Sequence, residues 1–151
     1  MKYPLRDLQA GKLLVASPAL EDEHFKRAVI LLAEHNASGS LGFVLNKPLE
    51  AKLQEAVEGF LYFDQKLSLG GPVETQALFY VHRFGQAIAG SQAIAQDLYW
   101  GGDFEALKNF VNSRQVPPDA LRFFVGYTGW SAGQLEGEMS EEAWLLAEGD
   151  H

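Results

Sequence analysis

The glycine-rich segment 126–135, which reads GYTGWSAGQL, is the part of the sequence best suited to carry chemistry. Within it, Gly129, Ser131 and Gly133 match the G-x-S-x-G pattern of the hydrolase nucleophile elbow, in which a serine stands on a tight turn between a strand and a helix. The apolar run 121–125 before the segment predicts a strand, and the residues after it predict a short helix. This context allows an exposed serine with backbone N–H groups arranged for an oxyanion.

The remainder of the chain disfavours a serine hydrolase. In the elbow mechanism the acid and the histidine follow the serine, yet only the terminal His151 does so here, and a chain end is poorly suited to hold a base. His35 or His82 stays open as a base, because triads are recognised by geometry and not by order. The simpler interpretation is that Ser131 and Gln134 form an S-x-x-Q capping box at a helix start. An intermediate interpretation is an anion site at the N-terminus of that helix.

A second glycine-rich element consists of Gly70, Gly71 and Pro72. Its glycines allow either a backbone nest for an anion or an ordinary turn, and the element is neither a P-loop nor a G-x-G-x-x-G fingerprint. Both this element and the segment 126–133 follow runs that predict strands. We therefore expect the two to lie close together and to share one concave site, the alternative being two unrelated turns.

Other polar residues have mainly structural interpretations. The histidines show neither H-x-x-x-H nor H-E-x-x-H spacing, so we predict no metal site, and no cofactor motif occurs. His35 and Asn36 begin a predicted turn over 35–39, and Asn46 ends the strand that follows, where hydrogen bonds to backbone are the usual role. The acidic run 136–142 predicts a solvated helix face.

Composition limits the possible partners. The net charge is −8, and the twelve Lys and Arg residues are scattered, with only Lys26 and Arg27 adjacent, so direct DNA binding is not expected. The chain has no cysteine, which excludes disulfides, thiolate zinc sites and a cysteine nucleophile. Residues 1–10 contain no apolar core of signal-peptide length, so we expect no export signal, and the longest aliphatic run, 28–33, is too short to cross a bilayer. We expect a cytoplasmic protein, without membrane contact, whose partner is a small anion or another protein.

The predicted elements alternate along the chain. Leu53, Ala56, Val57 and Phe60 fall on one face of an amphipathic helix, and Asp103 is suited to cap a second one. Residues 28–46 predict a β-hairpin with a longer loop. Short apolar runs predict the strands 13–16, 29–33, 42–46, 67–69, 77–81, 121–125 and 143–147. This pattern predicts an α+β fold, with a mixed, partly antiparallel sheet core and two or three flanking helices, as a single domain over 1–151.

Several separated motifs, taken together, resemble the YqgE/AlgH family of bacterial proteins. They are LLVASP at 13–18, EHN at 34–36, GFVLNKPL at 42–49, GGPV at 70–73, GYTGWSAGQLE at 126–136 and the tryptophan at 144. The resemblance covers nearly the whole chain. It implies a compact α+β fold and a cytoplasmic bacterial protein. It supplies neither catalytic residues nor a cofactor, so the catalytic residues are unknown. The candidate ligand-binding residues are the shared motif positions with the elbow serine: His35, Asn36, Asn46, Gly70, Gly71, Pro72, Tyr127, Gly129, Trp130, Ser131, Gly133 and Gln134.

Two departures from the family pattern bear on function. Relatives often carry another residue in place of Ser131, which makes the elbow pattern incidental. Relatives also usually continue for a few tens of residues past the strand at Trp144, so we expect this chain to be a short or truncated member. The leading hypothesis is a regulatory protein that binds a small anion, a nucleotide or a protein partner. The alternatives are an enzyme with an oxyanion or phosphate site at 126–133, and a transcriptional regulator.

Overall fold

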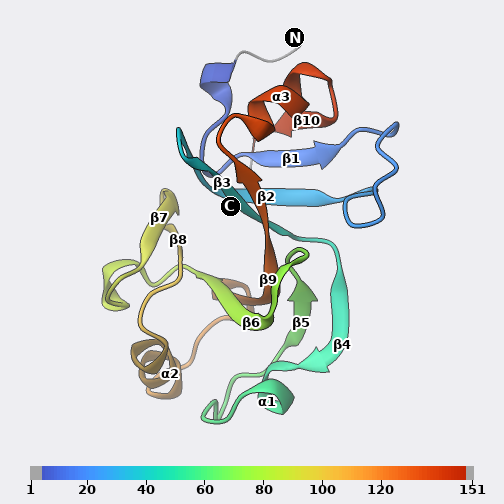
Figure 1. The fold of residues 1–151 in the computed structure, drawn as a ribbon. Coiled ribbons are helices and arrows are strands. Elements are labelled where there is room, and N and C mark those ends of the chain that lie inside the picture. Colours follow the sequence, from blue (N-terminus) through green and yellow to red (C-terminus); the bar gives the residue numbers. More distant parts are fainter. Residues whose placement is uncertain (1–4, 149–151) are drawn as a thin grey trace.

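The computed structural model describes residues 5–148, which form ten strands and three α-helices (Figure 1). The strands are β1 (Leu13–Ala16), β2 (Val29–Asn36), β3 (Gly39–Val44), β4 (Pro48–Lys52), β5 (Lys66–Leu69), β6 (Val73–His82), β7 (Gln92–Ala95), β8 (Leu98–Trp100), β9 (Leu121–Ser131) and β10 (Trp144–Ala147). The helices are α1 (Leu53–Ala56), α2 (Phe104–Asn112) and α3 (Gln134–Ser140). The α+β class expected from the sequence is confirmed.

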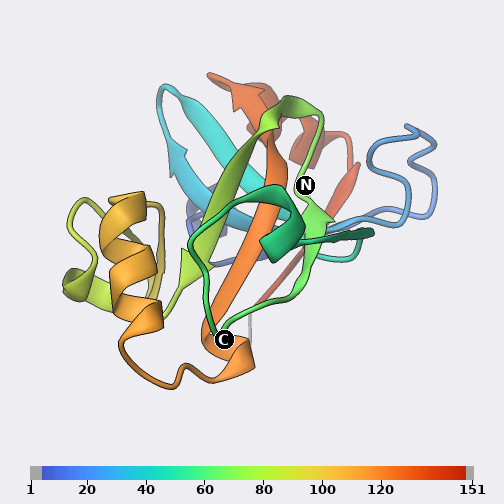
Figure 2. The same cartoon turned by 90° about the horizontal axis from the view of Figure 1, so that it is seen from below.

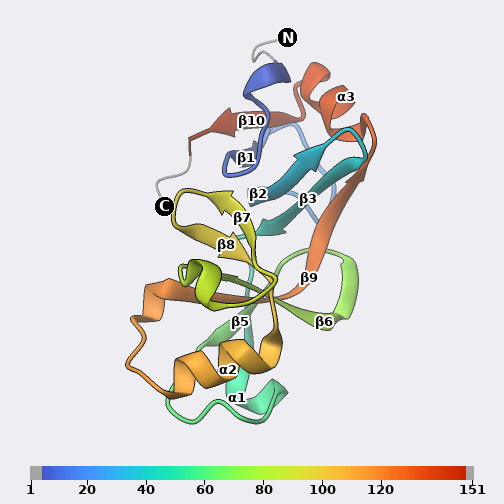
Figure 3. The same cartoon turned by 90° about the vertical axis from the view of Figure 1, so that its left-hand side faces the viewer.

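The sheet is organised around β9, its longest strand among the described residues. The strand order is β10-β1-β2-β3-β9-β6-β8-β7, with β4 joined through β5 to β9. The β5–β9 pair is parallel, whereas the other described pairs are antiparallel. The end of β9 pairs with β3, and the part before it runs beside β6 for most of its length (Figure 2). β9 therefore connects an upper half (β1, β2, β3, β10, α3) with a lower half (β4 to β8, α1, α2), as Figure 3 shows.

Three apolar clusters follow from the alternation of side chains along these strands. Phe123 points into a cluster beneath α2, and its neighbour Phe124 points to the opposite face, into a cluster between the two halves. A third cluster packs Trp130 and Leu135 beneath α3 in the upper half. Because adjacent residues of β9 serve different clusters, one strand holds both halves together.

The helix predicted from Leu53 to Phe60 is only one turn long. Val57 is extended and Gly59 has a φ of +106°, so the chain leaves the helix after Ala56. Phe60 is nevertheless buried in the cluster beneath α2. The apolar spacing therefore predicted correctly that Phe60 is buried, but the helical conformation that it predicted there was wrong. By contrast, α2 begins as predicted, because the Asp103 side chain accepts a hydrogen bond from the Ala106 N–H at 3.1 Å.

Three further expectations were wrong in detail. The β2–β3 hairpin has a tight two-residue turn instead of a longer loop, because β2 continues to Asn36, whose Oδ1 accepts the Ser38 N–H at 2.8 Å. The supposed connection 126–133 is mostly strand, since β9 extends to Ser131 through backbone pairing with β3. Strands β4, β7 and β8 were not anticipated at all.

Candidate functional site

The residues singled out from the sequence fall into three places. Most of them gather where the β2–β3 hairpin meets the end of β9 and the start of α3. Gly70, Gly71 and Pro72 join them from the side, because Val73 pairs with Tyr127. Asn46 lies at the other end of β3, where its side chain bonds the Val29 N–H and the Arg27 carbonyl, so it does not belong to the same site.

A hollow of about 440 Å³ lies at this meeting point. Four of the predicted site residues line it, and Val73, which follows the second glycine-rich element, closes one side. The complete lining is Glu34, Asn36, Ser38, Gly39, Ser40, Leu41, Val73, Tyr127, Gly129 and Trp130. The Tyr127 ring is held by an edge-on contact with Phe79, at 5.3 Å between ring centres.

The two glycine-rich elements are adjacent, as expected, but their glycines serve close packing of the backbone. A Cβ atom on Gly70 would stand 2.4 Å from the Gly126 carbonyl oxygen. The Gly70 N–H donates to the Val125 carbonyl at 2.8 Å, and the Gly70 carbonyl accepts from Thr128 Oγ1 at 3.0 Å. The Gly70 N–H is therefore already bonded and cannot contribute to an anion nest.

Ser131 does not form the elbow or the capping box that the sequence allowed. Its backbone N–H and its hydroxyl both point to Gln134 Oε1, at 2.9 and 3.2 Å, which is only one half of the reciprocal pattern. The residue before α3 is Gly133, whose left-handed φ of +76° suits glycine. Among the described residues no histidine hydrogen-bonds Ser131, so a base that would activate it is missing there.

Ser40, His35 and Glu136 form a serine–histidine–glutamate cluster, and Ser40 is the one of the three that also lines the hollow. His35 Nδ1 lies 2.6 Å from Ser40 Oγ, and His35 Nε2 lies 3.7 Å from Glu136 Oε2. His35 and Ser40 are cross-strand partners and share the face that α3 covers, where Ser40 is 9% exposed. The next cross-strand pair, Glu34 and Leu41, lies on the opposite face and lines the hollow. Ser40 is buried, and its hydroxyl is hydrogen-bonded to His35 beneath α3, which disfavours attack by Ser40 on a substrate in the hollow.

The carboxylate of Glu138 organises the α3 side of the site, and sequence reasoning missed it. It accepts hydrogen bonds from the indole N–H groups of Trp130 and Trp144, at 3.0 and 2.9 Å, and from Gln134 Nε2 at 3.0 Å. The acidic run was expected to be a solvated face, and Glu138 is the member that turns inward. The i, i+4 spacing from Gln134 and the two tryptophans were the available signals.

Charge is distributed unevenly around the hollow. The three adjoining segments 34–41, 70–76 and 126–142, here called the acidic end, contain no Lys or Arg. They contain the glutamates Glu34, Glu74, Glu136, Glu138, Glu141 and Glu142. The local potential is therefore negative, which opposes binding of a phosphate or a nucleotide at this hollow.

A family model described as AlgH-like matches residues 13–151. The chain belongs to the AlgH-like family. A protein named UPF0301 from Chlorobium luteolum is 49% identical over 141 residues, which cover 93% of this chain and 75% of that relative. A UPF0301 protein from Chlorobaculum parvum is 47% identical over 141 residues, which again cover 93% of this chain and 75% of that relative.

Two solved structures share the fold of this chain. The solution structure of AlgH from Pseudomonas aeruginosa superimposes with a TM-score of 0.76 and 29% identity, covering 99% of this chain and 82% of that one. The crystal structure of protein DIP2367 from Corynebacterium diphtheriae superimposes with a TM-score of 0.74 and 24% identity. The match covers 94% of this chain and 76% of that one. The similarity inferred from the separated motifs is thereby confirmed.

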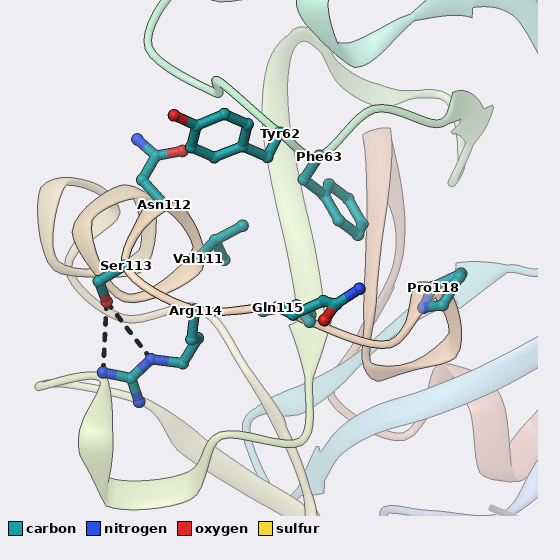
Figure 4. A pocket seen from close by; sticks show the side chains of 9 residues that line it. Tyr62, Phe63, Val111, Asn112, Ser113, Arg114, Gln115 and Pro118 are labelled. Carbon is teal, nitrogen blue, oxygen red and sulfur yellow. Dashed lines mark hydrogen bonds between the residues drawn. The ribbon is translucent and has the colours of Figure 1, made fainter.

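The AlgH-like chain has a larger hollow in its lower half, about 630 Å³, between α2 and the segment before β5 (Figure 4). Figure 4 shows the ring of Tyr62 beside Asn112 and above Val111, with Arg114 turned toward Ser113. Tyr62 is 82% exposed, and the Arg114 guanidinium lies 3.6 Å from the centre of the Phe110 ring. No histidine or carboxylate lines this hollow, so its lining offers neither an acid–base pair nor metal ligands.

Two further observations concern this AlgH-like chain as far as the structure describes it. Across residues 5–148, no group of three or more metal-ligating side chains comes together. Over the same residues, no helix has the length and apolar character needed to cross a membrane.

Proposed function

We propose that this protein is a regulatory binding protein, and that the hollow at its acidic end receives a lysine or arginine side chain of a partner protein. The observation that carries the proposal is the combination of a 440 Å³ hollow with a negative surround free of Lys and Arg. Of the small-anion, nucleotide and protein partners that the sequence left open, a protein with a basic side chain suits this hollow best.

The lining offers three kinds of contact to a cation. Glu34 supplies a carboxylate, Asn36 an amide oxygen, and Tyr127 an aromatic face. A cation over an aromatic ring gains about 0.5–1 kcal/mol at an exposed site. Because Phe79 holds the Tyr127 ring, less side-chain freedom is lost on binding.

The proposal places this activity in a bacterial cytoplasm, with which the absence of cysteine is compatible. A role in transcription would then act through a protein partner. Direct binding to duplex DNA is not expected at a net charge of −8, and an anisotropy titration at physiological salt tests that expectation.

The central experiment is a titration of ¹⁵N-labelled protein with acetyl-Gly-Lys-Gly-amide, followed by amide chemical shifts. We expect shifts confined to residues 34–41 and 127–131, with affinity that falls as sodium chloride is raised. Glu34→Gln should weaken binding about two- to fivefold, because one partly exposed charge contact is lost. Glu50→Gln, an exposed change on β4, should leave binding unchanged.

The matched probe replaces lysine by norleucine, which keeps the alkyl stem and removes the charge. Binding of both peptides with equal affinity would contradict the proposal, as would shifts that map to the lower half. A lack of salt dependence would contradict it too, because attraction between exposed charges is screened by salt.

A further inference from the structure

A smaller cavity of about 270 Å³ lies between the two halves, away from the acidic end. Leu13, Leu31 and Leu45 wall it from the upper half, and Val81 and Leu98 wall it from the lower half. In Figure 3 the β7–β8 hairpin, which carries Leu98, reaches up beside β2, consistent with the contacts between β7 and β2. The volume is just below the ~300–1,000 Å³ typical of ligand pockets, so it suits only a small molecule.

Arg122 brings a positive charge into this apolar setting. It lies opposite Val81 in the β6–β9 pairing, on the face that points toward the upper half. Its Nη2 donates to the Leu45 carbonyl and, at 3.0 Å, to Ser68 Oγ. Within residues 5–148, its Nη1 and Nε have no acceptor, and no carboxylate lies within 4.0 Å of the guanidinium.

The unused donors of Arg122 are accessible to a ligand, because among the described residues Trp100 Nε1, and no Arg122 atom, is buried without a hydrogen-bond partner. Arg122 is half-buried, and burial lowers its pKa, because the charged form loses solvation. A purely structural role would be met at lower cost by a neutral side chain that donates to the same two oxygens. The unused donors of a guanidinium form a planar fork that matches a carboxylate.

A second arginine lines the same cavity. Arg83 is the first residue after β6, its N–H donates to the Ala120 carbonyl at 3.0 Å, and it lines the cavity together with Val81 and Arg122. Its own contact with the protein is a 3.5 Å hydrogen bond from Nη1 to the Asp97 carbonyl. Asp119 is the one carboxylate in the lining. The cavity is therefore net positive in a protein of charge −8.

His82 also lines the cavity, but its ring is neutral and does not change the net charge of the lining. The Phe84 N–H donates to its Nδ1 at 3.2 Å, so Nε2 carries the proton and donates to the Gly101 carbonyl at 3.0 Å. Both nitrogens are thus occupied in the neutral ring.

We propose that this cavity binds a small organic carboxylate, with the carboxylate group on Arg122 and Arg83 and the apolar body between Leu13, Leu31 and Leu98. The two arginines select the anion, and the leucines select against inorganic anions. Because the walls come from both halves, the bound molecule contacts both. The site is separate from the acidic end and does not depend on the protein partner proposed there.

The test is a titration of ¹⁵N-labelled protein with hexanoate and with benzoate, at constant ionic strength. We expect amide shifts at residues 81–83, 98 and 120–122, together with a raised melting temperature. The neutral analogues hexanamide and benzamide, and inorganic phosphate, should bind about tenfold more weakly or not at all.

Variants separate the site from general stability. Arg122→Gln, which keeps donors for the Leu45 carbonyl and Ser68, should weaken hexanoate binding about tenfold or more. If that variant does not fold, Arg83→Gln provides the test, because Arg83 is exposed and its replacement should leave the fold intact. The affinity of Arg83→Gln for hexanoate should still fall severalfold. Arg114→Gln, a matched change outside the cavity, should bind hexanoate as the unaltered protein does.

Three results would overturn the proposal. Equal affinity for hexanoate and hexanamide would remove the role of the arginines, and equal affinity for hexanoate and phosphate would remove that of the leucines. Shifts confined to the acidic end, or to the larger hollow between α2 and the segment before β5, would place carboxylate binding elsewhere.

Discussion

Gly71 lies against the backbone of Tyr127, so closely that a Cβ atom on Gly71 would stand 2.2 Å from the Tyr127 carbonyl oxygen. The nearest obstacles are backbone atoms and the Thr128 hydroxyl, at 2.4 Å, none of which can move aside without disturbing β9. This contact explains why a glycine stands where the second glycine-rich element meets the sheet. It also joins β9 to the start of β6 beside the hollow of the acidic end.

Gly71→Ala should therefore lower the free energy of unfolding by about 1–3 kcal/mol or more, because the methyl group forces the two backbones apart. Urea unfolding monitored by tryptophan fluorescence measures the loss. Gly137→Ala is the matched control: Gly137 lies inside α3 with nothing within 4 Å of the added Cβ, so it should raise stability by about 0.5–1 kcal/mol. An unchanged stability for Gly71→Ala would contradict the close approach.

Removing the carboxylate of Glu138 should cost about 2–4 kcal/mol in Glu138→Leu. Trp130 and Trp144 are 6% and 2% exposed, so their indole N–H groups would lose their acceptor with little access to water. Glu141→Gln, an exposed change next to α3, should stay within about 0.5 kcal/mol. Equal effects of the two substitutions in urea unfolding would show that the inward carboxylate contributes no stability.

Stability should fall as the pH drops below about 6.5, through His82. Burial lowers its pKa from the usual 6.5, and this outweighs the opposite effect of its hydrogen bond to Gly101. Below the unfolded pKa the unfolded chain binds a proton that the folded protein excludes, so the stabilisation is complete above it and is lost on acidification. The slope from one such group is at most about 1.4 kcal/mol per pH unit.

Urea unfolding at pH 7.5, 6.5 and 5.5 measures this slope. It should diminish in His82→Gln, whatever that variant's stability at neutral pH, and persist in His24→Gln, an exposed change. A slope that is the same in His82→Gln would assign the pH dependence to another group.

Ser131 should be neither a nucleophile nor a helix cap. Its side chain is exposed, and the stronger of its two contacts with Gln134 uses the backbone N–H, so Ser131→Ala should change stability by less than about 0.5 kcal/mol. Mass spectrometry after incubation with a fluorophosphonate should find no adduct on Ser131 or on the buried Ser40. An adduct that prior denaturation abolishes would restore the hydrolase hypothesis.

Local patterns in the sequence were sufficient for several features. The Asp103 cap depends on a side chain and an N–H three residues apart, so the sequence alone specifies it. The strands β1 and β2 are short apolar runs bounded by turn residues, and they were anticipated for the same reason. The ordered motifs were sufficient to indicate the family, and four of the candidate residues that they supply do line the hollow of the acidic end.

The tertiary structure decided what depends on partners distant in the sequence. Residues 126–131 suggest a connection by composition, yet they are strand, because β3 supplies hydrogen bonds that no local pattern reveals. Phe60 is buried without a helix, because burial and conformation are separate outcomes of packing. Arg83 and Arg122 appear in the sequence as two scattered cations. Only the packing of β6 and the residue after it against β9 brings both arginines to one cavity, beside leucines from the other half of the molecule, where their charges add.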